Sequence, residues 1–304
     1  MLAIVIPYYK VKYFRETLFS LANQTDKRFK VYIGDDASLN NPEHVLKNFE
    51  GSFDYKYYRF EKNLGSEYLT KQWERCIDLT ADEAWIMILG DDDVLGETVV
   101  EEFYKGLERP NFASNVIRCA TIVIDERNKT YSDLFTHPEL ETGIEFSIRK
   151  LKHETRSSLS EYIFKKEAYL RHKFTHFPSA FYSDDKAWLD FSEEKKILSL
   201  NEAAVYIRIS DVSLSGTVKM RLLRESEYYY LRWLVRTKLN LFNKPDRIFI
   251  LKMLAHSFLC NDVDDISEWL SLYVNYLKNF QIGEFLRFQR KLIRMLAMKI
   301  FKYN

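Results

Sequence analysis

Two clusters of aspartates directly follow apolar runs that are typical of β-strands. Asp35 and Asp36 follow residues 31–33, and three aspartates at positions 91–93 follow residues 85–89. Carboxylates packed this closely repel one another, and a divalent cation relieves the repulsion. Mg²⁺ and Mn²⁺ favour oxygen ligands and usually bind one or two carboxylates together with substrate phosphates. The clusters therefore predict a metal and phosphate site. The alternative is a pair of acidic turns, in which aspartate is common.

An alternation of short strands and helices in the first half of the chain positions these aspartates. The strands are expected at residues 2–7, 30–33, 54–60 and 85–89, and the helices at residues 14–22, 42–49, 65–78 and 96–107. This alternation predicts βαβ units and a mostly parallel sheet. In open sheets of this kind ligands bind outside the carboxyl ends of the strands. Both clusters are therefore expected at the same edge.

The pattern loosens after Pro110. Strands are expected at residues 116–124, 162–165 and 203–209, and helices at residues 142–151, 167–171 and 182–191. From about residue 217 onward the chain is nearly all helical in pattern. The sequence therefore predicts an α/β part followed by a helical C-terminal segment.

The composition excludes several classes of protein. The chain has 304 residues, of which 46% are hydrophobic and 15% aromatic, so it is globular rather than disordered. Its net charge of +1 gives no sign of a nucleic-acid partner. Three widely spaced cysteines favour a reduced, cytoplasmic location. The apolar start of the chain reads as a strand rather than a signal peptide. The most apolar stretch, residues 248–259, is shorter than the roughly 20 residues that span a membrane.

Familiar catalytic motifs are missing from the sequence. There is no G-x-G-x-x-G after the first strand, no G-x-x-x-x-G-K-[ST] and no G-x-S-x-G. The six histidines show no metal-binding spacing. Because these motifs are absent from the sequence, the aspartate clusters are its main indication of function.

Five short motifs occur in a fixed order along the first 110 residues. They read IVIPYY (4–9), SLANQT (20–25), GDDAS (34–38), NLG (63–65) and ILGDDDVL (88–95). This set resembles the motifs of the inverting family-2 glycosyltransferases of the GT-A fold. The resemblance is strong over residues 1–110 and reappears in short islands up to residue 216. Gly90 departs from the pattern, since the family often has an aspartate there.

The resemblance implies a site for a nucleotide-diphospho-sugar donor, most often UDP-linked, with a metal ion. The residues implied to bind the donor are Pro7, Tyr9, Asp35, Asp36, Asn63, Asp91 and Arg208. Pro7 and Tyr9 would line the nucleobase pocket, and Asp35 and Asp36 would contact the base or ribose. Arg208 would reach the diphosphate or brace the serine-rich loop at residues 213–216, and a purely structural role fits it equally well.

The resemblance also implies the ligands of the metal, Mn²⁺ or Mg²⁺. Asp92 would be the metal-bridging carboxylate, with Asp91 and Asp93 beside it. The histidine that the family carries near the end of a later strand is replaced by Ser210. Asp211 is therefore the nearest candidate for a third protein ligand.

A further acidic cluster, the pair Asp184 and Asp185, precedes a predicted helix. The family has an acidic pair ahead of a helix, where one carboxylate acts as general base. The resemblance implies catalytic roles for both residues, with Asp185 as the base that deprotonates the acceptor hydroxyl. The alternative is a helix N-terminus, where the macrodipole favours aspartate.

The near-neutral net charge hides two oppositely charged parts. Residues 217–304 carry 16 basic and 8 acidic side chains, a net of +8, whereas residues 1–216 carry 29 and 36, a net of −7. On a helical wheel of the last segment the basic residues gather on one arc: Arg287, Arg290, Lys291, Arg294 and Lys302. Such a basic amphipathic helix can lie on an anionic membrane surface. The alternative is a helix docked on the catalytic domain with a solvated basic face.

These observations predict a GT-A-like α/β glycosyltransferase domain over residues 1–216 and a helical segment over residues 217–304. The expected activity is metal-dependent transfer of a hexose, with inversion, to a glycan or lipid-linked acceptor. By resemblance the pathway is surface-polysaccharide assembly, such as capsule or lipopolysaccharide, at the inner face of the cytoplasmic membrane. The alternatives are a nucleotidyltransferase and a catalytically silent, membrane-associated binding protein of the same fold.

Overall fold

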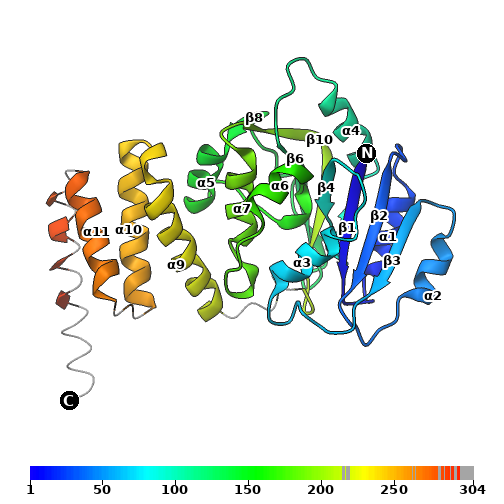
Figure 1. Cartoon of the computed structure of the whole chain (residues 1–304), viewed down its shortest axis with the longest axis horizontal. Coiled ribbons are helices and arrows are strands. Elements are labelled where there is room, and N and C mark those ends of the chain that lie inside the picture. The colour runs from blue at the N-terminus through cyan, green and yellow to red at the C-terminus, as the bar shows by residue number, and fades with distance from the viewer. Residues whose placement is uncertain are drawn as a thin grey trace. The chain divides into compact units, whose positions relative to one another are not determined.

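The computed structural model describes residues 1–213, 216, 220–261, 263, 265–279, 282–283, 285–287, 289–290 and 293–294. The chain forms two compact units, Met1–Val218 and Lys219–Asn304. In the first unit a single mixed sheet carries helices on both faces (Figure 1).

The strands of the first unit are β1 (Leu2–Tyr8), β2 (Phe29–Asp35), β3 (Asp54–Arg59), β4 (Trp85–Ile88), β5 (Val94–Leu95), β6 (Val116–Asp125), β7 (Thr130–Tyr131), β8 (Leu140–Thr142), β9 (Tyr162–Lys165) and β10 (Lys196–Ile209). Its α-helices are α1 (Phe14–Ala22), α2 (Glu43–Leu46), α3 (Leu69–Ile77), α4 (Val99–Leu107), α5 (Gly143–Leu151), α6 (Lys166–His172) and α7 (Ser183–Ser192). Three short 3₁₀ helices are η1 (Lys47–Phe49), η2 (Leu159–Glu161) and η3 (Pro178–Ala180).

The strand order is β3-β2-β1-β4-β9-β6-β10-β5, with β7 beside β6 and β8 beside β10. Strands β3, β2, β1 and β4 are parallel, and β10 is parallel to β6. Strand β9 is antiparallel to both of its neighbours, β4 and β6. The predicted α/β fold with flanking helices is confirmed, and most of the paired residues are in parallel strands. The sheet also contains antiparallel strands that the sequence pattern did not reveal, namely β5, β7, β8 and β9.

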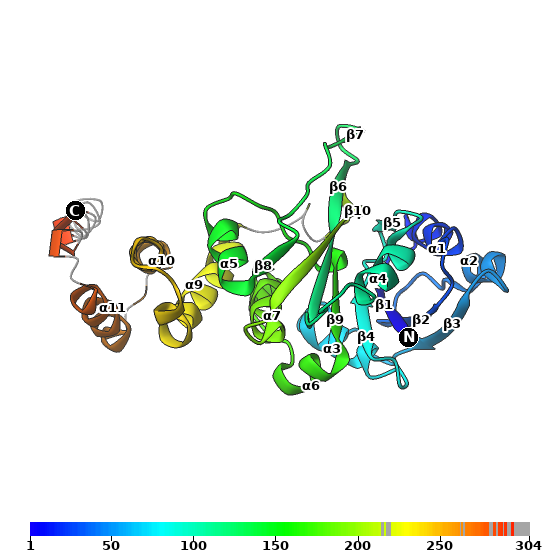
Figure 2. The same ribbon diagram turned by 90° about the horizontal axis from the view of Figure 1, so that it is seen from above.

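The alternation of side chains along β1 builds two cores, one on each face of the sheet. Leu2, Ile4 and Ile6 belong to a core completed by α1, α2 and α4. Ala3 and Val5 belong to the opposite core, which α3, α6 and α7 complete (Figure 2). Successive residues of a strand point to opposite faces, so a fully apolar strand must be covered twice. This burial fixes the carboxyl ends of the strands, where the aspartates lie.

The second unit contains α9 (Met220–Thr237), η4 (Leu239–Leu241), α10 (Lys244–Cys260) and α11 (Ile266–Lys278). Asn243 caps α10 by accepting a hydrogen bond from the Asp246 N–H at 3.0 Å, and a proline in the first turn favours the same start. Helix α10 packs on α9 and on α11. The confirmed fold therefore includes the helical C-terminal segment.

Much of the predicted basic amphipathic helix lies outside the described residues. Of its basic arc, Arg287, Arg290 and Arg294 are described, whereas Lys291 and Lys302 are not. Among the described residues, no helix combines the length and the apolar character needed to cross a bilayer.

Candidate functional site

The ends of β1, β2 and β4 meet at one edge of the sheet, as the sequence predicted. The Asp36 N–H donates to the Tyr8 carbonyl at 3.0 Å. Asp91 Oδ2, just beyond β4, accepts hydrogen bonds from the backbone N–H groups of Tyr9 at 2.7 Å and Lys10 at 2.6 Å. The two aspartate clusters are thus tied to the same turn after β1. Burial raises the pKa of Asp91 to about 6, although these two hydrogen bonds oppose the rise.

Asp35 is fully buried at the end of β2. Its carboxylate accepts hydrogen bonds from Tyr57 Oη at 2.6 Å, Arg59 Nη1 at 2.8 Å and the Ser38 N–H at 2.8 Å. Burial and the hydrogen bond to Asp35 raise the pKa of Tyr57 to about 12. With both oxygens engaged, Asp35 holds the turn after β2 against β3.

Asp36 holds the turn that precedes α3. Its carboxylate accepts hydrogen bonds from the backbone N–H groups of Leu64 at 2.7 Å and Gly65 at 2.9 Å, and it pairs with the Arg75 guanidinium. A Cβ on Gly65 would lie 2.7 Å from Asp36 Oδ2. The motifs at residues 34–38 and 63–65 therefore contact each other through Asp36. Gly65 is required there because a larger side chain would collide with the Asp36 carboxylate.

The remaining residues expected at the donor site lie around this turn. Asn63 Oδ1 accepts a hydrogen bond from the Ser66 N–H at 2.9 Å. Pro7 is partly exposed, and Tyr9 is 40% exposed. The Arg75 guanidinium lies 3.8 Å from the centre of the Phe60 ring. An exposed aromatic and a stacked guanidinium next to buried carboxylates can hold a planar, hydrogen-bonding ligand.

Asp93 is buried and hydrogen-bonded through both oxygens. Oδ2 accepts from Ser160 Oγ at 2.5 Å, and Oδ1 accepts from the Arg208 N–H at 2.8 Å. Ser160 Oγ also accepts from the Gly90 N–H at 2.9 Å. A Cβ on Gly90 would lie 2.8 Å from Asp93 Oδ2. The space of the side chain that the family often has at position 90 is therefore taken by Asp93.

Asp92 differs from both of its neighbours. It is partly exposed, and among the described residues its carboxylate makes no hydrogen bond or ion pair. Burial, followed by the negative charges of Asp93 and Asp91, raises its pKa to about 8. A carboxylate held beside like charges without a cationic partner fits a divalent cation.

The described residues alone do not form a complete metal site here. No group of three or more histidine, cysteine or acidic side chains in the described part of the chain could hold a metal ion. Mg²⁺ often takes one or two carboxylates and completes its shell with substrate phosphates and water. The residues present therefore fit a metal that binds together with a phosphate-bearing ligand.

The guanidinium of Arg208, at the end of β10, makes hydrogen bonds, ion pairs and a ring contact. Nε donates to the Asp92 carbonyl at 2.8 Å, and the two Nη groups pair with Glu126 and Glu16. The guanidinium also lies 4.2 Å from the centre of the Tyr13 ring. Of the roles left open from the sequence, this geometry favours the structural one, and it shows Arg208 holding the loop that carries Asp92, which the sequence did not predict.

Asp211 lies in a more exposed setting. Its side chain is 71% exposed and pairs with Lys12 Nζ at 3.0 Å. This pairing lowers the pKa of Asp211. In the described residues Asp211 joins no metal-binding group with Asp92 or Asp93, so its role as a ligand stays a prediction.

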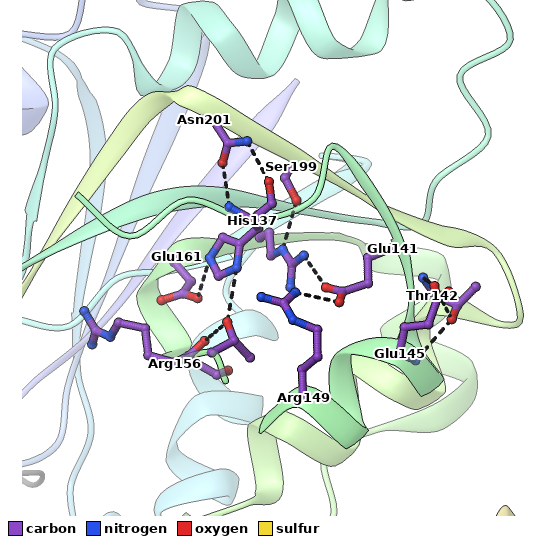
Figure 3. Close-up of polar contacts among 12 residues, drawn as sticks. His137, Glu141, Thr142, Glu145, Arg149, Arg156, Glu161, Ser199 and Asn201 are labelled. Atoms are coloured by element: carbon purple, nitrogen blue, oxygen red, sulfur yellow. Dashed lines mark hydrogen bonds and ion pairs between the residues drawn. The ribbon is translucent and has the colours of Figure 1, made fainter. Parts of the chain in front are cut away.

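A buried polar cluster includes Glu161, the residue that follows Ser160 (Figure 3). Neither His137 nor Glu161 has any exposed side-chain surface, and His137 Nε2 lies 3.8 Å from Glu161 Oε1. Burial raises the pKa of Glu161 to about 7 and lowers that of His137 to about 3. Beside them, Arg118 is fully buried and pairs with Glu141 at 2.5 Å. The segment next to the aspartates is thus anchored from inside the fold.

Asp184 and Asp185 lie in the first turn of α7. Asp185 is buried, its Oδ1 has no hydrogen-bond partner, and its Oδ2 lies 4.0 Å from Lys150 Nζ. Asp184 is less buried, and burial together with the charge of Asp185 raises its pKa to about 7. A carboxylate oxygen without a hydrogen-bond partner can accept a hydroxyl proton.

The segment before α7 packs against the donor edge. The His176 ring lies 5.1 Å from the Tyr68 ring, and His176 Nδ1 lies 3.2 Å from Thr70 Oγ1. The Phe174 N–H donates to Glu74 Oε1 at 3.1 Å. Helix α3, which carries Thr70 and Glu74, follows the turn held by Asp36. These contacts therefore connect the segment before Asp184 and Asp185 to the helix that follows the turn held by Asp36.

A comparison with sequence families identifies the family of this chain. The family model described as glycosyl transferase family 2 matches residues 3–185, more than half of the chain. The chain belongs to glycosyl transferase family 2. The matched residues include every candidate from Pro7 to Asp185, whereas Arg208 and Asp211 lie beyond them. No curated protein sequence matches the chain.

Solved structures of a Staphylococcus aureus protein have the same fold. The crystal structure of S. aureus TarS 1–349 in complex with UDP-GlcNAc has a TM-score of 0.64 and 16% identity, and covers 92% of this chain and 80% of that one. TarS 1–349 in complex with UDP has a TM-score of 0.61 and 16% identity, with 92% and 81% covered. The structure of S. aureus TarS itself has a TM-score of 0.61 and 18% identity, with 84% of this chain and 43% of that one covered.

Two residues of this family-2 site escaped the sequence reasoning. Ser160 contacts both Gly90 and Asp93, and Arg75 contacts Asp36. Ser160 belongs to a polar stretch with no motif, so its role depends on long-range pairing of β9 with β4. The role of Arg75 could have been predicted from the sequence. Arg75 lies on the helix that follows the N-x-G element, one helical turn beyond residues 69–72.

Proposed function

We propose that this family-2 glycosyltransferase transfers a hexose, with inversion, from a UDP-sugar to a glycan or lipid-linked acceptor. The observation that carries the proposal is Asp92, a partly exposed carboxylate without a partner among the described residues, at the edge where the donor-type motifs meet. The uridine donor is supported by TarS, of the same fold, whose structures were solved with UDP-GlcNAc and with UDP.

Asp92 is proposed to bind Mn²⁺ or Mg²⁺ together with the diphosphate of the donor. A divalent cation at this position would offset the charge that develops on the leaving diphosphate. Asp91 and Asp93 are proposed to act by holding the loop, since their oxygens already accept hydrogen bonds from backbone and serine donors. Asp93 and Asp211 remain further candidate ligands.

The nucleoside is proposed to lie along Tyr9 and Pro7, beside the turn that Asp36 holds. Asp35 and Asp36 accept hydrogen bonds from the protein through both oxygens. They are therefore proposed to shape the pocket, and Asn63 to close its turn. Aromatic and apolar walls with a few fixed polar groups are typical of nucleotide pockets.

Asp185 is proposed to act as the general base. Its unpartnered Oδ1 would accept the proton of the acceptor hydroxyl while the acceptor oxygen forms a bond to the anomeric carbon. The bond between that carbon and the diphosphate oxygen breaks on the opposite face, and the diphosphate leaves with the electron pair. Attack from the opposite face gives inversion.

A donor panel tests the reaction. Release of nucleoside diphosphate from UDP-, GDP- and dTDP-sugars is measured with Mn²⁺, with Mg²⁺ and with a chelator, using water as acceptor. We expect metal-dependent release that is fastest from a UDP-sugar. A faster reaction with a GDP- or dTDP-sugar would contradict the uridine donor, and no release from any sugar would contradict the proposed activity.

Two matched variants test the base. Asp185→Asn should slow the same reaction by about 10²–10⁴, because a general base contributes about that much. Asp184→Asn should keep the rate within about tenfold, since the neighbouring carboxylate remains. Equal losses in both variants would contradict the assignment of the base to Asp185.

The acceptor and its location are also part of the proposal. A lipid-linked glycan in surface-polysaccharide assembly would lie at the inner face of the cytoplasmic membrane, and the enzyme would reach it as a peripheral protein. The excess of basic residues in 217–304 supports this location, since anionic lipids attract such segments.

A further inference from the structure

Helix α11 has two apolar faces, of which one is buried. Leu272 and Tyr276 are buried, and Glu268 on the same side pairs with Arg232 and Arg236 of α9. A helix that packs on one side needs only one apolar stripe. The second apolar face is therefore not explained by the packing of the described residues of this unit.

The second face consists of Ile266, Leu270, Val274 and Leu277. Their spacing places them within an arc of about 80° on the side away from Leu272, at about 100° per residue. Their side chains are between 45% and 73% exposed. We call these four residues the α11 surface. A continuous exposed apolar stripe of this kind marks a surface that binds something.

The sequence that follows α11 is strongly basic. Residues 278–304 contain seven basic side chains and one acidic side chain. Three more aliphatic residues in this stretch, Ile282, Leu286 and Ile293, are exposed. Phe285 packs on α11, since its ring lies 5.3 Å from the Tyr273 ring. In the sequence, apolar and basic side chains therefore follow directly after the α11 surface.

We infer that the α11 surface docks the protein on an anionic phospholipid membrane. The aliphatic side chains would enter the boundary between headgroups and acyl chains, and the basic side chains would meet the lipid phosphates. A second copy of the chain fits this surface less well, because two sets of excess positive charge would come together. The inference rests on the peripheral membrane location in the proposed function and names the surface responsible for it, but it does not depend on the identity of the donor.

Vesicle binding by the full chain tests this inference. Co-sedimentation is measured with phosphatidylcholine vesicles that contain or lack phosphatidylglycerol. The test variant is L270E/L277E, which places two acidic residues on the α11 surface. The matched control is S267E/N275E, which adds the same charge to the polar side of the same helix. Both substituted leucines are exposed, and circular dichroism melting checks that every variant is folded.

The wild type should bind phosphatidylglycerol vesicles and bind phosphatidylcholine vesicles weakly. L270E/L277E should reduce binding about tenfold or more, and S267E/N275E should reduce it far less. Equal losses in the two variants would show a general charge effect and would overturn the inference. So would equal binding to both kinds of vesicle, or a wild-type dimer that L270E/L277E converts to a monomer without any change in vesicle binding.

Failure of this inference is distinguishable from failure of the proposed function. Release of nucleoside diphosphate from a soluble UDP-sugar does not involve the α11 surface, so L270E/L277E should keep that rate. A variant that binds vesicles poorly but turns over the donor normally supports the docking surface by itself.

Discussion

At the scale of single residues, the three neighbouring aspartates have different environments. Asp91 and Asp93 accept hydrogen bonds from the loop and the strands around them, and Asp92 has no such partner among the described residues. The motif D-D-D could not separate these roles, because the three residues differ only in what the distant segments at Tyr9, Ser160 and Arg208 donate to them.

This difference predicts opposite effects on stability. Asp93→Asn should lower the free energy of unfolding by about 1–3 kcal/mol, because buried donors from Ser160 and Arg208 lose a charged acceptor. Asp92→Asn should leave it unchanged or raise it, because it removes a carboxyl whose ionised form is disfavoured by burial and by two neighbouring acidic groups. Thermal unfolding without metal measures both variants. An Asp92→Asn protein less stable than Asp93→Asn would contradict the distinction.

Glu161 predicts a pH dependence of stability. Burial raises its pKa from 4.5 in the unfolded chain to about 7 in the fold, so between these values the folded state binds more protons. Stability from this residue is therefore fully present below pH 4.5 and lost as the pH rises to about 7. Urea unfolding should show a loss that is about 1–3 kcal/mol larger in the wild type than in Glu161→Gln, since other buried carboxyls with raised pKa values contribute equally in both proteins. Identical pH profiles for the two proteins would contradict the buried, protonated carboxyl.

At the scale of elements, most boundaries followed from sequence and the exceptions have physical causes. The helix at residues 14–22 was predicted with its observed bounds. The helix expected from residue 65 begins at Leu69, and the residues before it form the turn that Asp36 holds through the N–H groups of Leu64 and Gly65. Strand β10 begins at Lys196 rather than at residue 203, because its first part pairs with β8 and β6. Periodicity cannot show contacts between segments so far apart.

The turn before α3 makes a prediction about the donor site. Gly65→Ala would place a Cβ 2.7 Å from Asp36 Oδ2, so the turn must shift or lose its hydrogen bonds. We expect the KM for the donor to rise and stability to fall by about 1–3 kcal/mol. The control is Gly283→Ala, where an added Cβ meets nothing within 4 Å. A Gly65→Ala enzyme with an unchanged KM would separate this turn from the donor site.

At the scale of the whole molecule, charge and architecture divide the chain at nearly the same place. The sequence predicted domains of 1–216 and 217–304, and the two compact units are Met1–Val218 and Lys219–Asn304. We propose that the two units have different functions. The donor site lies in the acidic unit, and the docking surface lies in the basic one.

This division predicts the behaviour of a shortened chain. A protein that ends at residue 218 should release nucleoside diphosphate from a UDP-sugar at a rate within about tenfold of the full chain, because the proposed catalytic residues lie in the first unit. It should no longer bind anionic vesicles. Loss of donor turnover in a shortened protein that is still folded would show that residues 219–304 contribute to the donor site.

We propose above all that Asp92 is the carboxylate through which metal and donor are bound. The rate of UDP release from a UDP-sugar is measured as a function of Mn²⁺ for the wild type and Asp92→Asn. We predict saturation with Mn²⁺ in the wild type and a rate about a hundredfold or more lower in Asp92→Asn, with unfolding unchanged. Equal rates and the same Mn²⁺ dependence in the two proteins would contradict the claim.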